Sequence, residues 1–268
     1  MRNNEDRFNP AAHSAAPGGL HYVVPTELVE LPSKGRFYPE GHPLHNKDFV
    51  EIKHMTAKEE DILTSTTLIE KGVVLQYLVA SLLMDKQINP QSLLPGDQNA
   101  ILVNARVNAY GNDYSFESKC DSCEKLIQID VDLNEIRTKE AEGDYYINQD
   151  GYVSLKLEKS NFLVELKQLS LNEIEVAQKN SSAHSTIGTT TKLLLSIIKT
   201  INGEVNDGGL KFINVIENLP SKDVRQLKEA YNKTKPDIDF SLFIECKACG
   251  HTKEGIMPIT ARFFWPDA

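Results

Sequence analysis

The first half of the chain alternates between segments with strand periodicity and segments with helix periodicity. Alternating apolar and polar residues predict strands, and the last two of these strands form a hairpin. Thr56 and Glu59 fit a Thr-x-x-Glu capping box at a helix start, and Pro95-Gly-Asp97 fits a second start. The expected elements are strands over 49–55, 114–119 and 126–133, and helices over 73–84 and 100–109.

The second half repeats much of this order. Ser170 and Glu173 give another capping box, Ser-x-x-Glu, after two strand-like segments. A compact apolar helix, a Gly-rich loop and a helix that starts at Pro220 follow, and then a second hairpin. The expected elements are strands over 153–157, 163–167, 239–245 and 257–263, and helices over 189–201 and 220–231.

The parallel order indicates a diverged internal duplication. IKHMTAKEEDIL, from Ile52, aligns with LKQLSLNEIEVA, from Leu166, and an Ala-Tyr pair precedes the first cysteine pair of each half. We therefore expect an α+β fold of two similar halves, 29–140 and 141–268, each a helical part followed by a β-hairpin with a cysteine knuckle. Residues 1–28 are rich in Asn, Ala, Pro and Gly without a period, which predicts a flexible N-terminal arm.

Composition narrows the class of protein. With 40% hydrophobic and 25% charged residues, the 268-residue chain resembles an ordinary globular protein. It has no apolar run of about 18 residues and no apolar N-terminal segment, so we expect neither a membrane span nor a secretory signal. The net charge of −9 argues against binding to free nucleic acid or to an anionic membrane surface.

The four cysteines form two C-x-x-C pairs, which lie 122 residues apart. Two residues between thiolates let the backbone turn both sulfurs toward one ion, and two such knuckles complete a tetrahedral site. Zinc is favoured over iron, and both a redox pair and four unrelated thiols are weaker alternatives. We therefore expect a Cys₄ metal site that joins the two halves, with the ligands Cys120, Cys123, Cys246 and Cys249.

Catalytic motifs are absent from the sequence. It contains no phosphate-binding loop, no dinucleotide fingerprint, no H-E-x-x-H and no G-x-S-x-G, and its histidines are scattered. Glu59, Glu60 and Asp61 stand in the first turn of a predicted helix, where they complement the helix dipole. Arg106, on a mostly apolar helix, is expected to pair with a carboxylate. These features favour a protein that is not an enzyme.

Several motifs together resemble a known family. ELPSKGRFYP, MTAKEEDIL, LLPGDQNAILVNARVNAYGNDY, the two C-x-x-C pairs and the terminal FFWP are similar to the baseplate hub proteins of T-even-like, contractile-tailed bacteriophages, over residues 29–268. The resemblance implies a structural or assembly subunit of the virion's tail baseplate, assembled in the host cytoplasm in multiple symmetric copies. Its partners would be other hub or tail-tube proteins. The expected partner-binding residues are Leu31, Pro32, Gly35, Phe37, Tyr38, Pro39, Phe263, Phe264 and Trp265.

Two other functions are compatible with the sequence. A nucleic-acid-associated zinc-ribbon adaptor could present the lysines beside the knuckles to phosphate, although the net charge opposes it. An assembly chaperone would help to build the tail and be absent from the mature virion. The lysines in question are Lys119, Lys125, Lys247 and Lys253.

Overall fold

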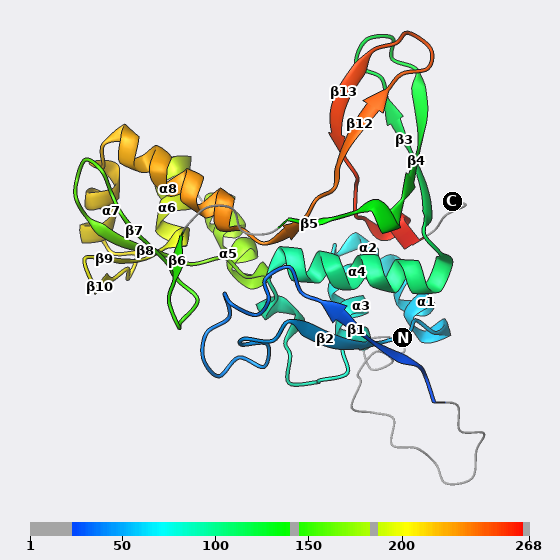
Figure 1. The fold of residues 1–268 in the computed structure, drawn as a ribbon, viewed down its shortest axis with the longest axis horizontal. Coiled ribbons are helices and arrows are strands. Elements are labelled where there is room, and N and C mark those ends of the chain that lie inside the picture. The colour runs from blue at the N-terminus through cyan, green and yellow to red at the C-terminus, as the bar shows by residue number, and fades with distance from the viewer. Residues whose placement is uncertain (1–22, 140–144, 183–186, 265–268) are drawn as a thin grey trace.

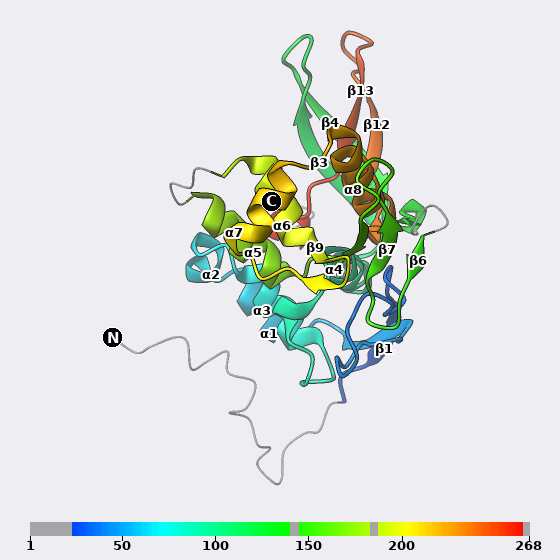
Figure 2. The same cartoon turned by 90° about the vertical axis from the view of Figure 1, so that its left-hand side faces the viewer.

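The computed structural model describes residues 23–139, 145–182 and 187–264. It shows a mixed helix and strand protein with a central body, a lobe beside the body and two β-hairpins that project from the body (Figure 1). The two hairpins lie side by side in both views (Figure 2). The lobe is built from residues that lie between the two hairpins in the sequence, so the chain leaves the first hairpin, forms the lobe and returns.

The body combines one antiparallel strand pair with four helices. Strand β1 pairs with β2 so that Val29 faces Val50, and both side chains are buried. The longest helix, α4, starts with proline at its first position, where no N–H is required. The elements are β1 (Thr26–Glu30), β2 (Phe49–Lys53), α1 (Ala57–Leu63), α2 (Thr66–Glu70), α3 (Val74–Leu82), η3 (Pro90–Ser92) and α4 (Pro95–Tyr110).

The lobe contains a five-stranded sheet in the order β10-β9-β8-β7-β6, in which all neighbours are antiparallel. Its helices pack against the buried residues of the sheet. The elements are β6 (Tyr146–Ile147), β7 (Val153–Lys156), β8 (Leu163–Leu166), α5 (Leu171–Ser182), α6 (Thr189–Ile197), β9 (Ile198–Ile201), β10 (Glu204–Val205), α7 (Leu210–Glu217) and α8 (Ser221–Thr234).

The projecting part consists of the two hairpins and short elements at their bases. A small strand pair, β5 with β11, links the end of the first hairpin to the segment that leads into the second. The elements are β3 (Asp113–Lys119), β4 (Leu126–Asp132), η4 (Leu133–Glu135), β5 (Thr138–Lys139), β11 (Asp237–Ile238), β12 (Ser241–Glu245), β13 (Thr252–Ile256) and η5 (Ala261–Phe264).

The capping boxes of body and lobe are built alike. Glu59 accepts hydrogen bonds from the backbone N–H of Thr56 at 2.9 Å and from its hydroxyl at 2.6 Å, and pairs with Lys53 at 2.6 Å. The same contacts recur in the lobe, with the same spacing, at Lys167, Ser170 and Glu173. In both places a strand leads directly into a helix whose first free N–H groups are satisfied.

The long helices α4 and α8 each bury an aspartate in their first turn. Asp97 accepts from the N–H of Ser33 at 3.0 Å, from the Ser33 hydroxyl at 2.6 Å and from the Tyr38 hydroxyl at 2.6 Å. Asp223 accepts from the N–H groups of Lys159 at 2.9 Å and Ser160 at 2.8 Å. Each carboxylate thereby holds the loop after a strand, β1 or β7, against the start of a helix.

Two buried clusters of unequal size result. The main hydrophobic core is one contiguous cluster in space that includes residues of both body and lobe. Its members are spread along the chain between Val29 in β1 and Phe264 in η5. A smaller cluster lies between the hairpins. No helix in the described ranges is long and apolar enough to cross a membrane.

Several predicted boundaries are wrong. The predicted helix over 189–201 stops at Ile197, because the next four residues pair with β8 as strand β9. The second arm of the C-terminal hairpin is Thr252–Ile256, immediately after the knuckle, and not 257–263. Helix α7 was not predicted. Strand β1 starts at Thr26, so it overlaps the end of the predicted arm, while residues 1–22 of that arm lie outside the described residues.

Candidate metal centre

Each hairpin turns at a cysteine pair, and the two turns share two backbone hydrogen bonds. The N–H of Cys120 donates to the carbonyl of Lys125 at 2.9 Å, and the N–H of Glu124 donates to the carbonyl of Cys120 at 3.0 Å. In the second turn, Cys246 donates to His251 at 2.8 Å, and Gly250 donates to Cys246 at 2.8 Å. The two knuckle segments that align in sequence therefore adopt similar backbone turns.

A left-handed residue closes both turns. Glu124 has φ of +58° and Gly250 has φ of +72°, each four residues after the first cysteine of its pair. Glycine adopts this conformation at no steric cost, whereas glutamate pays for it. The knuckle geometry thus dictates the backbone even where the sequence provides no glycine.

The two knuckles bring all four sulfurs together at the tips of the hairpins. The four Sγ atoms lie within 4.8 Å of one another. Cys120 Sγ is 3.8 Å from Cys249 Sγ, and Cys123 Sγ is 3.7 Å from Cys246 Sγ. A tetrahedral zinc site with Zn–S bonds of about 2.3 Å has S···S distances of about 3.8 Å. The cluster is therefore compatible with a metal ion bound by four thiolates, two from each hairpin.

The backbone around the sulfurs favours thiolate at one position. Hydrogen bonds from the backbone N–H groups of Cys123 and Ser122 lower the pKa of the Cys120 thiol to about 6. The N–H of His251 lowers the pKa of Cys249, but desolvation and the three neighbouring thiols outweigh it and raise that pKa to about 11. Four thiols this close cannot all ionise without a cation, and a bound metal would supply the charge that deprotonates them.

Apolar and ionic contacts support the cluster from below. Ile127 of the first hairpin and Ile244 of the second are buried between the hairpins with Cys120 and Cys246. Lys253 crosses from the second hairpin to Asp121, with both N···O distances 3.1 Å, and donates to the carbonyl of residue 119 at 3.0 Å. The hairpins are thus in contact below the sulfurs, and the thiol cluster does not hold them together alone.

Arg106 fixes the bases of the hairpins. Its guanidinium donates to the carbonyls of Gly111 at 2.8 Å and Asp113 at 3.0 Å, where the first hairpin begins. Its Nε donates to the carbonyl of Phe263, which follows the second hairpin, at 3.0 Å. The predicted carboxylate partner is therefore wrong, because three backbone carbonyls satisfy this buried cation.

The residues expected to bind partners are mostly buried in the chain's own core. Tyr38 is 2% exposed and donates to Asp97, while Phe263 and Phe264 are completely buried. Pro39 is exposed. Trp265 lies outside the described residues. Partner binding by these segments stays a prediction. In the single chain most of these residues are buried, namely Leu31, Pro32, Gly35, Phe37, Tyr38, Phe263 and Phe264.

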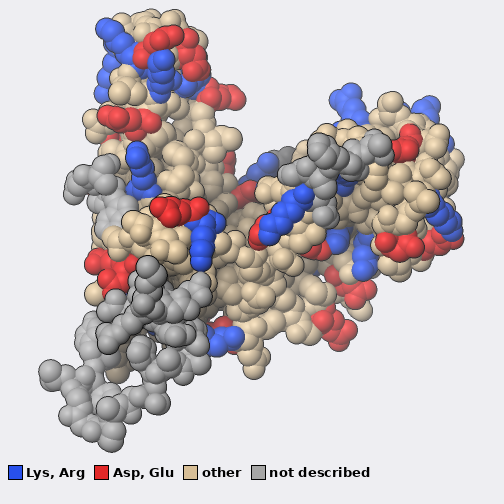
Figure 3. Space-filling view, turned by 180° about the vertical axis from the view of Figure 1, so that it is seen from behind, with Lys and Arg blue, Asp and Glu red and all other residues tan. Residues whose placement is uncertain are grey.

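The lysines near the knuckles are partly neutralised. Lys119 pairs with Glu124 at 3.0 Å, and Lys253 pairs with Asp121. Figure 3 shows acidic and basic side chains intermingled at the hairpin tips. The knuckles therefore do not present a uniformly basic surface of the kind that phosphate binding requires.

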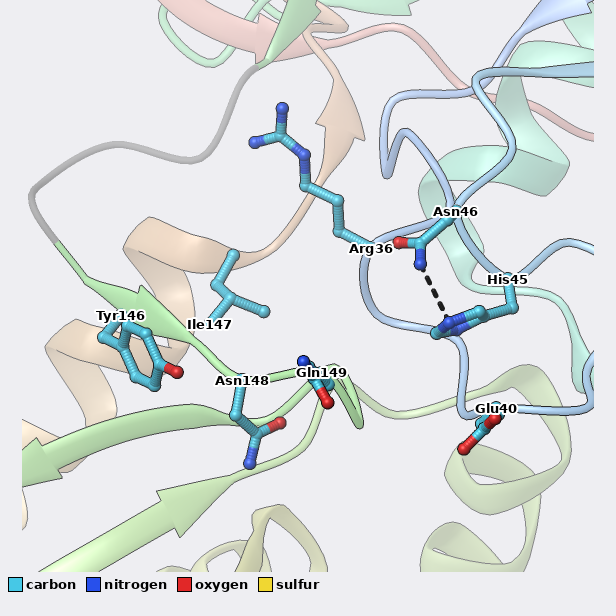
Figure 4. Close-up of a pocket in the computed structure, with 8 residues that line it drawn as sticks. All are labelled: Arg36, Glu40, His45, Asn46, Tyr146, Ile147, Asn148 and Gln149. Atoms are coloured by element: carbon cyan, nitrogen blue, oxygen red, sulfur yellow. Dashed lines mark hydrogen bonds between the residues drawn. The ribbon is translucent and has the colours of Figure 1, made fainter.

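A hollow of about 410 Å³ lies between the loop after β1 and strand β6 (Figure 4). Asn46 and His45 are hydrogen-bonded at 2.8 Å, and the guanidinium of Arg36 points away from Glu40. These side chains form no nucleophile–base pair or carboxylate pair, so this hollow has no evident catalytic arrangement. Its lining residues are Arg36, Glu40, His45, Asn46, Tyr146, Ile147, Asn148 and Gln149.

Comparison with known proteins identifies the family. Residues 25–265 match a family model described as T4 bacteriophage base plate protein. Comparison with curated proteins finds no match, and comparison with solved structures finds none either. The match covers the body, the lobe and both cysteine hairpins. The chain therefore belongs to the T4 bacteriophage base plate protein family.

Proposed function

We propose that this protein is a structural or assembly subunit of the hub of a phage tail baseplate. Family membership supports a structural role in the baseplate and a place in the virion tail. The observation that carries the proposal further is the four-cysteine cluster, because four thiolates leave no open coordination position for a substrate. We infer that the protein is not an enzyme, that it assembles in the host cytoplasm, and that its partners are other hub or tail-tube subunits.

We further propose that the two halves, 29–140 and 141–268, arose by duplication. The Cα pairing of β3 with β4 recurs in β12 with β13, with every position shifted by 126 residues. The same shift relates Asp97 to Asp223. A shift of 126 residues also relates β1 to β7, whereas a shift of 114 residues relates the two capping boxes. The loop after β1, which carries Tyr38, is therefore 12 residues longer than the loop after β7. The second half in turn has 12 more residues between its capping box and its buried aspartate.

Zinc is the ion that we propose for the site, with iron as the alternative. Metal analysis of the purified chain should find about one ion bound, and iron–thiolate would give a coloured protein whereas zinc would not. The double substitution Cys120→Ser and Cys123→Ser should release the ion and lower the free energy of unfolding by about 3 kcal/mol or more. For a chain of this size, that is a shift in Tm of roughly 6–12 °C.

Ser122→Ala is the matched control for this double substitution. It lies in the same turn, its side chain is exposed, and the turn uses only its backbone N–H. We expect it to leave metal content and Tm unchanged. A metal-free chain with the stability of the metal-bound protein would contradict the proposed site.

Mass spectrometry of purified virions tests the place in the particle. A permanent hub subunit should be present in a fixed ratio to other baseplate proteins. Presence only in infected cells, and absence from purified particles, would support the assembly chaperone instead. Steeply salt-dependent DNA binding would support the zinc-ribbon adaptor.

A further inference from the structure

The outer faces of the two hairpins differ in chemistry although their strands pair in the same register. The shift of 126 residues places Phe243 where the first hairpin has Glu117, and Ile256 where it has Asp130. The first hairpin forms with carboxylates at these two positions. The hairpin fold itself therefore does not require apolar side chains there.

These two apolar residues form one exposed patch. Phe243 is 74% exposed and Ile256 is 76% exposed. They are diagonal neighbours on adjacent antiparallel strands, which places them within reach of each other on the same face. Neighbouring apolar side chains left in water are typical of an interaction site.

Acidic residues complete this face, which we call the outer face of the second hairpin: Phe243, Glu245, Glu254 and Ile256. The two glutamates are exposed, and neither forms an ion pair with another described residue. Two copies of this face placed against each other would bring their carboxylates together. The charge therefore disfavours a symmetric contact and favours a partner surface with basic side chains around an apolar contact area.

The chain itself carries a surface with these properties. A hollow of about 380 Å³ lies along α8 and is bordered by β5. Four cationic side chains surround one carboxylate, Glu229, which pairs with Lys233 at 2.7 Å. The stems of lysine and arginine give such a hollow apolar walls below the charges. This α8 groove is lined by Lys139, Arg225, Lys228, Glu229, Asn232 and Lys233.

We propose that the outer face of the second hairpin docks into the α8 groove of a second copy of this chain. Helix α8 and the second hairpin belong to different parts of the molecule, the lobe and the projection (Figure 1). A contact between two different surfaces is head-to-tail, and repetition of it gives a ring where the rotation closes. The inference rests on the multi-copy assembly proposed above and names the surfaces that would build it.

Sedimentation equilibrium of the purified full chain tests this contact. At concentrations up to about 200 μM, the wild-type chain should associate beyond the monomer. The association should weaken between about 0.1 M and 1 M salt, because salt screens exposed charges. The double variant Phe243→Glu and Ile256→Asp, which copies the first hairpin, should remain monomeric. Its circular dichroism and Tm should match the wild type, because both side chains are exposed.

Two charge-swapped chains give the sharper test. Glu245→Lys with Glu254→Lys makes the hairpin face basic, and Arg225→Glu with Lys228→Glu makes the groove acidic. Each variant alone should be monomeric, since its face and its groove then carry like charge. An equal mixture of the two should associate again, because each face meets an opposite groove on the other chain.

Glu117→Gln with Asp130→Asn, on the equivalent face of the first hairpin, is the control and should associate like the wild type. A wild-type chain that is monomeric throughout, or association that survives the Phe243 and Ile256 substitutions, would overturn the proposal. These measurements need no virion. They can therefore contradict the proposed contact between copies even if mass spectrometry finds the protein in the virion, which would leave the proposed function intact.

Discussion

At the residue scale, Asp97 is a buried carboxylate without an ion pair among the described residues. Burial raises its pKa, and the hydrogen bonds from Ser33 and Tyr38 offset only part of this effect. Three donors on a loop 59 and 64 residues away in sequence converge on this one side chain. The LPSKGRFYP motif therefore has a local purpose, which is to fix the loop after β1 against α4.

Asp97→Ala should destabilise the protein by about 3 kcal/mol. The substitution leaves the Ser33 N–H, the Ser33 hydroxyl and the Tyr38 hydroxyl buried without their acceptor. Urea denaturation measures the change. Asp61→Ala, an exposed aspartate on α1, is the control and should change stability by less than about 0.5 kcal/mol. Equal effects at the two positions would contradict the role of Asp97.

The capping-box glutamates titrate in the opposite direction. Burial raises the pKa of Glu59, but hydrogen bonds from Lys53, Ser81 and Thr56 outweigh burial and hold the pKa below its ordinary value. The same balance, with Lys167 as the main donor, lowers the pKa of Glu173. Asp223 also has a lowered pKa, because backbone N–H groups outweigh its burial.

These shifts predict how stability depends on pH. A carboxylate whose folded-state pKa is lowered stabilises the fold above its ordinary pKa, and this contribution is lost as pH falls through the folded value. Asp97, with a raised pKa, acts in the opposite sense, so its contribution to stability increases as pH falls. The pKa values of Glu229 and Asp239 are lowered as well, mainly by hydrogen bonds from Lys233 and Ser241. Among the described carboxyl groups, the lowered ones thus outnumber the raised one, so the free energy of unfolding should fall below about pH 4.5. Glu59→Gln should flatten this dependence in urea titrations across pH, and an unchanged slope would contradict it.

At the element scale, the sequence predicted strands and helices wherever period and caps agreed. The first hairpin, β2, α3 and the starts of α4 and α8 follow from alternation, capping boxes and proline. Strand β9 was missed because LLLSIIKTI is mostly apolar, so period alone does not separate the end of a helix from a buried strand. Strand β13 was misplaced because its residues, Thr-Lys-Glu-Gly-Ile, are mostly polar on an exposed hairpin, and the knuckle determines their register.

The grouping of the four cysteines was predictable from the sequence, whereas the burial of several aromatic side chains was not. The C-x-x-C spacing identified all four sulfurs that lie together, since each pair needs only local backbone geometry. Phe37, Tyr38 and Phe263 were assigned to docking, whereas Asp97 and the core hold them. Burial of an aromatic side chain depends on contacts with distant segments, which a single sequence does not display.

A close approach between elements fixes the lobe against the body. Gly151, in the turn between β6 and β7, has φ of +79°, and a Cβ there would lie 2.8 Å from backbone atoms of Arg36 and Phe37. Gly203 has a similar φ of +81° with nothing within 4 Å. Gly203→Ala should lower the free energy of unfolding by about 1 kcal/mol, because alanine is strained at positive φ. Gly151→Ala should lower it by roughly 1–3 kcal/mol more, because its Cβ would also clash with the backbone of the loop after β1. Thermal unfolding of both variants compares them, and equal costs would mean that this contact is not close in solution.

At the scale of the whole molecule, the thiol cluster is separated from the main core. The hairpins meet in a small cluster of their own, while body and lobe share one continuous core. Removal of the proposed metal ion should therefore loosen the projection without unfolding the rest of the protein.

Hydrogen exchange with and without a chelator measures this separation. Amides of β3, β4, β12 and β13 should exchange on the order of a hundredfold faster after chelation, while those of α3 and α4 should lose less of their protection. The Lys253–Asp121 pair is too exposed to replace the metal. Uniform loss of protection across the chain would show instead that the site stabilises the entire fold.

The distance in sequence between the two knuckles also governs when the site can form during synthesis. Cys246 emerges from the ribosome 126 residues after Cys120, a delay of about 6–25 s at bacterial elongation rates. During that interval the first knuckle offers only two thiols, and the whole lobe is synthesised before the second knuckle emerges. A truncated chain that lacks the second hairpin can never complete the cluster. Four-thiol coordination thus marks a polypeptide that has been translated at least through its second knuckle.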